Sequence, residues 1–302
     1  AAMTPSEKIR HKALEMGFDA VGIARCRPLT SQRETFDRWL ERGYDGSLDY
    51  LRRNVDKRFD PALLFEGARS VVVCAASYKR PPSTGPVASR IASYARSRDY
   101  HLTIKEKLFE LLKALEELMP GSRGRVFTDT APLSEKSWAV EAGLGWIGRH
   151  SLLVHPRLGS FLLLGEIVTT AELEPDAPFE GEGCGPCRAC MEACPAGAIL
   201  LDRKIDAGRC ISRRTVEKAE GDEGDLHGWL FGCDACQLAC PRNRRATETD
   251  HPLFAPIAEL ESSDVAEWTA MTQERFDQLY GETPLSRCGL ARIQARIRKL
   301  FP

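Results

Sequence analysis

The 302-residue chain has no long apolar run and almost no net charge, and both absences narrow what it can do. Its longest apolar runs fall far short of the roughly 20 residues that a membrane-spanning helix needs, so we expect no membrane partner. No charged start followed by an apolar stretch opens the chain and no twin-arginine signal is present, which predicts a cytoplasmic location. A net charge of −1 gives no global nucleic-acid signature, so such contacts must come from local basic patches.

Common catalytic motifs are also missing: there is no Gly-x-Ser-x-Gly, Walker A or His-Glu-x-x-His. Residues 143–148 match G-x-G-x-x-G, but a helical pattern precedes them and a strand pattern follows. A dinucleotide fingerprint needs the reverse order, so we interpret these glycines as a tight turn or a close backbone approach. Asp99-Tyr100-His101 begins like the D-x-H-x-x-G loop that brings histidine to cobalt in some corrinoid proteins. Ile104 occupies the glycine position, so we predict that His101 is a hydrogen-bonded residue at a helix start.

Cysteine, by contrast, is concentrated: eight of the eleven lie in one window. The first run has the spacing of bacterial two-cluster ferredoxins, in which the fourth cysteine of each run crosses to the other cluster. A proline after each run prevents regular helix from continuing into the cluster. The runs are Cys184-x2-Cys187-x2-Cys190-x3-Cys194-Pro195 and Cys210 followed by Cys233-x2-Cys236-x3-Cys240-Pro241. The predicted [4Fe–4S] ligand sets are Cys184, Cys187, Cys190 and Cys240 for one cluster, and Cys194, Cys210, Cys233 and Cys236 for the other.

Two other uses of these cysteines are weaker. Structural zinc sites usually show paired C-x2–4-C knuckles, which the runs lack. Disulfides are disfavoured because a cysteine-rich cluster in a cytoplasmic chain points to metal. Of the scattered cysteines, Cys74 sits in an apolar run and is expected to be a small core residue.

The pattern along the chain predicts three parts. Strands alternate with helices over residues 3–172, which indicates an α/β domain. An acidic linker over 172–183 leads into a ferredoxin-like part, 173–245, and a short helical tail follows, 246–302. Predicted helices cover 6–18 (with Ser6 as N-cap), 31–43, 100–119, 134–143 and 285–300, and predicted strands cover 19–25, 68–78, 125–130, 150–156 and 160–170.

Basic residues gather beside the predicted clusters. Such patches can bind phosphates, or they can offset cluster charge and form solvated faces; the sequence leaves both open. They comprise Arg203, Lys204, Arg209, Arg213, Arg214 and Lys218 around Cys210; Arg242, Arg244 and Arg245; and Arg287, Arg292, Arg296, Arg298 and Lys299 in a tail helix without acidic residues.

Asp129 lies at the end of a predicted strand, where catalytic groups are often found in α/β folds. The alternative is that Asp129 or Thr130 only caps the next turn.

Several blocks of the chain together resemble the epoxyqueuosine reductase family. The resemblance runs from near the start to about residue 260 and is far more specific than the cysteine spacing alone. Its main blocks are DTAPLSEKSWAVEAGLGWIGRHSLL (129–153), GSFLLLGEI (159–167), CGPCRACMEACPAGAI (184–199), IDAGRCIS (205–212) and GCDACQLACPRN (232–243), with LRRN…KRFDP (51–61) and RDYH (98–101).

The resemblance implies an enzyme that reduces epoxyqueuosine to queuosine at the wobble position of tRNA. It implies cobalamin bound in the α/β domain, nitroreductase-like and without a histidine on the lower face of cobalt, and fed by two [4Fe–4S] clusters. Asp129 matches the family's proton donor, and we expect burial or the cofactor to raise its pKa. An external donor such as a flavodoxin or ferredoxin and a monomeric state are further expectations.

The same resemblance assigns binding residues. For cobalamin these are Arg53, Asp129, Lys136, Arg149, His150, Leu153, Cys233 and Asp234; for tRNA they are Ser212, Arg213, Arg214 and Lys218. Many members continue into C-terminal helical repeats that are not seen here. Three alternatives stay open: a corrinoid reductive dehalogenase-like reductase, an electron-transfer iron–sulfur protein, and a non-catalytic tRNA-binding protein.

Overall fold

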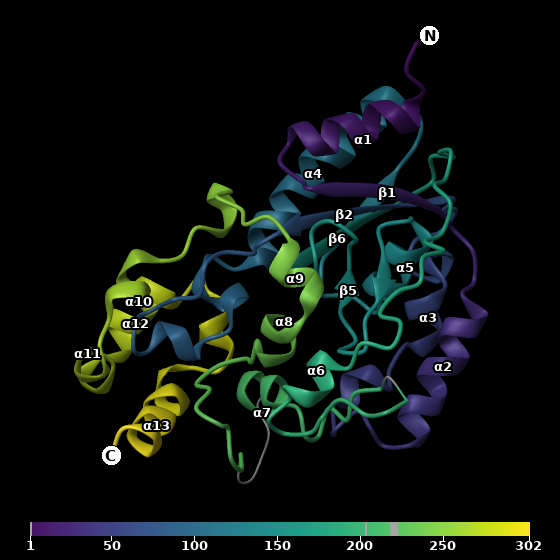
Figure 1. Ribbon diagram of the computed structural model, residues 1–302. Coiled ribbons are helices and arrows are strands. Elements are labelled where there is room, and N and C mark those ends of the chain that lie inside the picture. Colours follow the sequence, from purple (N-terminus) through teal and green to yellow (C-terminus); the bar gives the residue numbers. More distant parts are fainter. Residues whose placement is uncertain (1, 203, 218–222) are drawn as a thin grey trace.

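The computed structural model describes residues 2–202, 204–217 and 223–302, with a twisted sheet near one end (Figure 1). The strands lie in the order β1-β2-β6-β3, and every neighbouring pair is antiparallel. Their bounds are β1 Ala20–Arg25, β2 Ser70–Ser77, β3 Gly124–Phe127 and β6 Leu162–Thr169. β2 is buried along its whole length, which confirms the strand predicted from the apolar run over 68–78.

Helices cover both faces of this sheet, because successive strand residues point to opposite sides. Val72 and Ile167 belong to the core under α1 (Pro5–Glu15) and α4 (Tyr100–Leu118). Val73 and Val168 belong to the core under α5 (Glu135–Glu141), beyond which lie α2 (Thr30–Glu41) and α3 (Val55–Phe59). The predicted α/β architecture is therefore present, built on an antiparallel sheet.

The first helix starts two residues earlier than predicted. Thr4, not Ser6, is the N-cap: its hydroxyl accepts from the Glu7 N–H at 3.2 Å, and the Glu7 carboxylate accepts from the Thr4 N–H at 2.7 Å. Pro5 suits the first helical position, where its missing N–H costs nothing. Ser6 is buried and instead accepts from the Glu174 N–H at 2.7 Å, which fastens the acidic linker to α1.

The glycine-rich segment after α5 forms a turn, as predicted. Gly143 has a φ of 78° at the end of α5, and a short hairpin of β4 (Trp146–Ile147) and β5 (Leu153–Val154) follows. A Cβ on Gly145 would lie 2.1 Å from the Val154 carbonyl oxygen, so only glycine permits this approach. The predicted strand over 150–156 is in fact reduced to the two residues of β5.

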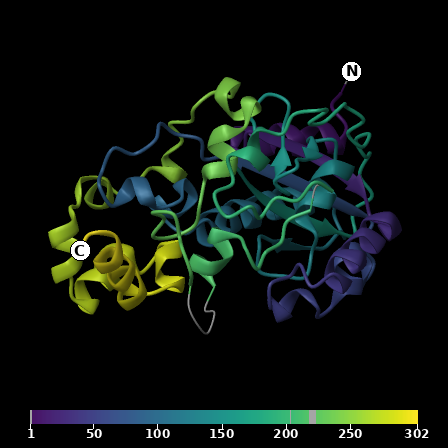
Figure 2. The ribbon, with the colours of Figure 1, turned by 60° about the horizontal axis from the view of Figure 1, so that its bottom comes forward.

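The cysteine region and the tail consist of short helices joined by loops. The tail packs against residues 87–95 and 230–231 to form a third core that includes Trp268 and Ile293 (Figure 2). Among the helices of the described ranges, none is both long and apolar enough to cross a membrane. The helices are α6 Ala189–Glu192, α7 Ile211–Val216, α8 Ala235–Ala239, α9 Pro241–Arg245, α10 Ala258–Ser262, α11 Val265–Ala270, α12 Gln273–Tyr280 and α13 Leu290–Leu300, and the 3-10 turns are η1 Asp49–Leu51, η2 Pro61–Leu63, η3 Ala88–Arg90, η4 Ser93–Arg96, η5 Pro252–Phe254 and η6 Pro284–Arg287.

Candidate active site and cluster cysteines

Asp129 lies just beyond the end of β3, in the loop that leads to α5. Its backbone has a φ of 46°, in the left-handed region that aspartate tolerates better than most residues. The Asp129 N–H donates to Glu135 Oε1 at 2.5 Å, and the preceding Thr128 hydroxyl donates to the Leu164 carbonyl at 2.9 Å. These two bonds hold a strained residue in one place. The Asp129 side chain is 63% exposed, although neighbouring protein groups still affect its pKa.

Two residues from the start of α4 reach this carboxyl. Tyr100 Oη donates to Asp129 Oδ2 at 2.6 Å, and His101 Nε2 lies 3.7 Å from the same oxygen. His101 Nδ1 is 2.6 Å from Asp99 Oδ1, and the Asp99 side chain also caps α4 by accepting from the His101 N–H at 2.9 Å. The prediction that His101 is a hydrogen-bonded residue at a helix start is thereby confirmed, and Asp99, His101 and Asp129 form one chain of contacts.

The pKa of Asp129 in this set of contacts differs from our expectation. Burial raises the pKa of Asp129, but contact with His101, the hydrogen bond from Tyr100 and the charges of His101 and Lys136 outweigh it and lower the pKa below its ordinary value. The expectation of a raised pKa is therefore wrong. Burial lowers the pKa of His101, but its bonds to Asp129 and Asp99 raise it to about 9. At neutral pH the pair holds one proton, and that proton resides on His101.

Two further carboxyl groups, those of Glu135 and Glu166, lie near Asp129 and were not predicted from the sequence. Glu166 is fully buried on β6, where it pairs in register with Val73, and neither of its oxygens has a hydrogen-bond partner of ordinary geometry in the described parts of the chain. Burial raises the pKa of Glu135 to about 7, with Asp129 adding to the rise, and burial and then Glu135 raise that of Glu166 well above its usual range. Burial therefore favours the neutral form of Glu166. A glutamate inside the apolar run SFLLLGEIVTT was the signal available in the sequence.

Three of the predicted cobalamin residues meet beside the hairpin. Lys136 Nζ donates to the Ser151 carbonyl at 2.6 Å, and burial lowers the pKa of this lysine. His150 is 3% exposed; burial and then the charge of Lys136 lower its pKa to about 4, so its ring is neutral. Leu153 is buried in β5. The charge of Lys136 also lowers the pKa of Asp129, so Lys136, His150 and Leu153 lie near the Asp129 carboxyl.

The remaining cobalamin candidates lie in other segments. Arg149 Nη2 donates to the Gly185 carbonyl at 3.0 Å and so joins the hairpin to the first cysteine run. Asp234 is 3% exposed, accepts from the Ser93 N–H at 2.7 Å, and borders a cavity of about 260 Å³ that Asp129 does not line. Arg53 is exposed after η1, and Cys233 is half-buried next to Asp234.

Buried donors allow a test of whether a corrin suits this surface. In the described residues, Arg58 Nε and Arg149 Nε are buried without a hydrogen-bond partner. Buried N–H groups of this kind call for an acceptor. A corrin carries amide arms, and their carbonyl oxygens are acceptors of the kind these donors call for. The residues present therefore fit the group.

The clustered cysteines affect one another's pKa in combinations that agree with the two predicted ligand sets. Burial raises the pKa of Cys190 to about 11, and its thiol neighbours Cys184, Cys240 and Cys187 add to the rise. Cys240 comes from the second run, so it crosses to the first. Burial likewise raises the pKa of Cys233 to about 12, with Cys210 and Cys194 contributing. Thiols that oppose each other's ionisation in this way are normally held deprotonated by metal.

Donors also point at the sulfurs, as in iron–sulfur proteins, where such bonds tune the cluster potential. Trp146 Nε1 donates to Cys184 Sγ at 3.3 Å, and the Ala198 N–H donates to Cys194 Sγ at 3.3 Å. Cys187 is exposed. Within the described ranges, no three His, Cys, Asp or Glu side chains converge tightly enough to hold a single metal ion. A zinc site with Zn–S bonds of about 2.3 Å needs its sulfurs within about 4 Å of one another, whereas a cubane needs them farther apart.

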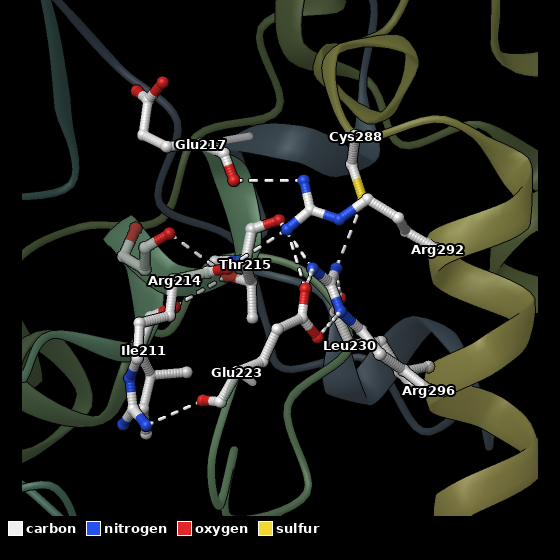
Figure 3. Close-up of polar contacts among 11 residues, drawn as sticks. Ile211, Arg214, Thr215, Glu217, Glu223, Leu230, Cys288, Arg292 and Arg296 are labelled. Carbon is white, nitrogen blue, oxygen red and sulfur yellow. Dashed lines mark hydrogen bonds and ion pairs between the residues drawn. The ribbon is translucent and has the colours of Figure 1, made fainter. Parts of the chain in front are cut away.

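The predicted tRNA residues lie on and after α7. Ser212 and Arg213 are half-buried there, and Lys218, like Arg203 of the same basic patch, falls outside the described residues. The Arg214 guanidinium donates to the carbonyls of Glu223 and Arg209 at 2.8 and 3.0 Å. Figure 3 shows that Arg292 and Arg296 of the tail also turn inward, toward Glu223. Much of the basic charge seen in the sequence is thus engaged within the protein.

Comparisons with known proteins agree with this geometry. Residues 58–130 match the family described as epoxyqueuosine reductase QueG, DUF1730, and residues 183–243 match the 4Fe-4S double cluster binding domain. The chain is 41% identical to an epoxyqueuosine reductase of Cyclobacterium marinum over 92% of this chain and 91% of that protein.

Solved structures give the same result. A crystal structure of epoxyqueuosine reductase with an epoxyqueuosine-modified tRNA-Tyr stem loop is similar with a TM-score of 0.87 and 28% identity, over 97% of this chain and 80% of that one. A Bacillus subtilis epoxyqueuosine reductase, whose catalytic aspartate loop is swung out of the active site, is similar with a TM-score of 0.87 and 27% identity over the same shares.

Proposed function

The chain belongs to the epoxyqueuosine reductase family, and from this premise we propose that it reduces epoxyqueuosine to queuosine at the wobble position of tRNA with Asp129 as the proton donor. The reaction removes the epoxide oxygen: two C–O bonds break, a C=C bond forms, and two electrons and two protons convert the oxygen to water. A protein that catalyses it must therefore supply electrons to the carbon side and protons to the oxygen side.

The residues fit the two kinds of cofactor that deliver those electrons. The eight cysteines of the two crossed sets would hold two [4Fe–4S] clusters, and Arg53, Lys136, Arg149, His150, Leu153, Cys233 and Asp234 would hold cobalamin beside Asp129. When bound, the clusters supply single electrons and cobalamin supplies a low-valent cobalt for opening the epoxide. His150 is 3% exposed and Lys136 Nζ is turned inward to the Ser151 carbonyl, so neither side chain presents a competing metal ligand at the surface.

The contacts of Asp129 carry the proposal. An oxygen leaves far more readily as a hydroxyl than as an alkoxide, so a positioned acid is worth roughly 10² to 10⁴ in rate. Tyr100 fixes Oδ2 at 2.6 Å, and protonated His101, 3.7 Å away, can pass its proton to that carboxyl when the oxygen takes one. Asp99 holds the other ring nitrogen and stabilises the charged imidazolium. Asp99, His101 and Asp129 together thus store one proton, and the exposed Asp129 carboxyl delivers it.

Several coarser features complete the proposal. Residues 3–172 would form the nitroreductase-like catalytic domain, 173–245 the cluster domain and 246–302 the tail. Ser212, Arg213, Arg214 and Lys218 would meet the tRNA. A flavodoxin or ferredoxin would reduce the clusters, and the protein would act as a cytoplasmic monomer.

Asp129→Asn tests the assignment. Asparagine keeps the size of the side chain and can still accept the Tyr100 hydrogen bond, but it cannot release a proton. With anaerobically reconstituted, reduced enzyme, mass analysis of the tRNA nucleosides should show epoxide reduction slowed by roughly 10² to 10⁴. Cobalamin uptake and tRNA binding should match the parent. Near-normal reduction by the variant would remove Asp129 from the mechanism.

A further inference from the structure

Three arginines of the C-terminal tail converge on one short helix of the cluster region, α7. Arg296 is 4% exposed, and its guanidinium donates to both Glu223 oxygens at 2.5 and 2.9 Å, to the Leu230 carbonyl at 2.6 Å and to the Thr215 carbonyl at 3.1 Å. Figure 3 shows the Arg296 side chain reaching from α13 to Glu223 and Leu230. A buried arginine with this many hydrogen-bond partners is held in one orientation and has a structural role.

Arg292, one turn earlier on α13, extends the same network. It donates to the Glu217 carbonyl at 3.0 Å, to the Arg214 carbonyl at 3.3 Å and to Glu223 Oε1 at 2.6 Å. Arg287 of η6 binds both carboxylate oxygens of Glu217 at 2.8 and 3.0 Å.

These contacts meet a specific need of α7. The last carbonyls of a helix have no partner within it, and they attract positive charge. The carbonyls of Arg214, Thr215 and Glu217 receive their donors from Arg292 and Arg296. Glu223 places a carboxylate between the two guanidiniums, and although burial opposes it, their hydrogen bonds and charge lower the pKa of Glu223 to about 2. The tail therefore caps the C-terminal end of α7.

The position of α7 gives this cap a consequence. The helix begins directly after Cys210, a ligand of the second predicted cluster, and it carries Ser212 and Arg213. It ends at Val216, and Glu217, which follows as the C-cap residue, is bound by Arg287 and Arg292. One short helix therefore connects a predicted cluster ligand with the residues that the tail arginines bind.

We propose that Arg292 and Arg296 are positioning residues that hold α7, and with it Cys210 and the proposed tRNA-binding residues Ser212 and Arg213, in place, and that they do not contact tRNA phosphates themselves. The part concerning tRNA rests on the proposed function; the clamping of α7 does not. A basic helix without acidic residues would otherwise be read as a phosphate-binding surface, so the two roles must be separated by experiment.

Matched variants separate them. Arg296→Met keeps the length of the side chain and removes its charge and bonds, and Arg298→Met makes the same change at an exposed position of the same helix. Each protein is reconstituted anaerobically and examined for amide hydrogen exchange and for the affinity of an epoxyqueuosine-containing anticodon stem loop as a function of salt. Arg296→Met should speed exchange of the 211–217 amides at least 10-fold and weaken stem-loop binding, with an unchanged salt slope. Arg298→Met should leave the exchange of these amides as in the parent.

Glu223→Gln provides the decisive contrast and guards against misfolding of the arginine variant. If the network only supplies positive charge to tRNA, removing this carboxylate strengthens binding. If the network positions α7, the same substitution loosens the helix and weakens binding. A lost phosphate contact would instead lower the salt slope for Arg296→Met by about 0.7 to 0.9.

These experiments also distinguish failure of the proposed holding of α7 by the tail arginines (the clamp) from failure of the proposed function. Unchanged exchange at 211–217 in both Arg296→Met and Glu223→Gln overturns the clamp whatever the tRNA result. Tighter stem-loop binding by Glu223→Gln, or a reduced salt slope for Arg296→Met, overturns the positioning role. A parent protein that binds no stem loop refutes the tRNA function, while the exchange result still decides the clamp.

Discussion

Replacing His101 with glutamine should move the pH dependence of epoxide reduction, and the structure sets the size of the effect. The His101 side chain is 25% exposed, and its pKa rises from an ordinary value of 6.5 to about 9. Since one pKa unit corresponds to about 1.4 kcal/mol, the contacts with Asp129 and Asp99 outweigh burial and stabilise the protonated ring by a net of roughly 3 kcal/mol. In the parent protein the proton is therefore available to Asp129 up to about pH 9.

In His101→Gln the carboxyl must carry the proton alone. The Tyr100 hydrogen bond and the charge of Lys136 remain and still lower the pKa of Asp129, while burial still raises it. The rate should then begin to decline at a lower pH than in the parent and be lower at pH 7, because each pH unit above the pKa of the acid costs about a factor of ten. Binding of cobalamin and tRNA should be unchanged.

The assay is single-turnover reduction by pre-reduced enzyme, measured across pH by mass analysis of the nucleosides. His11→Gln serves as a matched control, because His11 is exposed on α1 and pairs with Glu15, away from Asp129. The parent and the control should both lose activity near pH 9. If His101→Gln shows the same limb near pH 9 and the same rate at pH 7, the proton is not stored on His101 and the couple has been misassigned.

Other predictions test the surroundings of the site. Glu166→Gln should flatten the pH dependence of amide exchange in the 128–134 loop. In the parent, Glu135 and Glu166 have raised pKa values, so they stabilise the folded state at pH values below the ordinary glutamate pKa. This protection is lost as the pH rises through about 7, the pKa of Glu135. Protection that falls with pH equally in both proteins would exclude this role. Trp146→Phe removes the N–H that donates to Cys184 Sγ, so spectroelectrochemistry should find the potential of one cluster lowered and the other unchanged. Equal potentials in parent and variant would show that this bond does not tune the cluster.

Local features of the chain could be predicted where the signal is local. The apolar run over 70–77 specified a buried strand because each of its residues has to leave water. The cysteine spacing predicted two ligand sets, because a cubane cluster limits which thiols can bind it together. The pKa effects among these thiols agree with both sets. The N-cap was missed by two residues because Thr4 and Ser6 are both small hydroxyl residues, and only the capping box with Glu7 separates them.

Features that depend on distant contacts could not be predicted. The antiparallel order arises because β2 pairs with β6, about ninety residues later, and no pattern within either strand encodes that choice. The lowered pKa of Asp129 depends on His101 and Tyr100, which reach it from another helix. The tail arginines seemed free because their partner, Glu223, lies about seventy residues earlier in the sequence. In each case the deciding group belongs to a different element.

The measurement that bears most directly on the catalytic account is corrin uptake by anaerobically reconstituted protein. Protein with a full iron load is mixed with cobalamin, freed of excess, and examined by ultraviolet–visible and electron paramagnetic resonance spectroscopy before and after reduction. We expect one corrin per chain, reduced through the clusters and without a histidine ligand on its lower face. Protein that holds its iron and never retains the corrin would contradict the account and leave only an electron-transfer role.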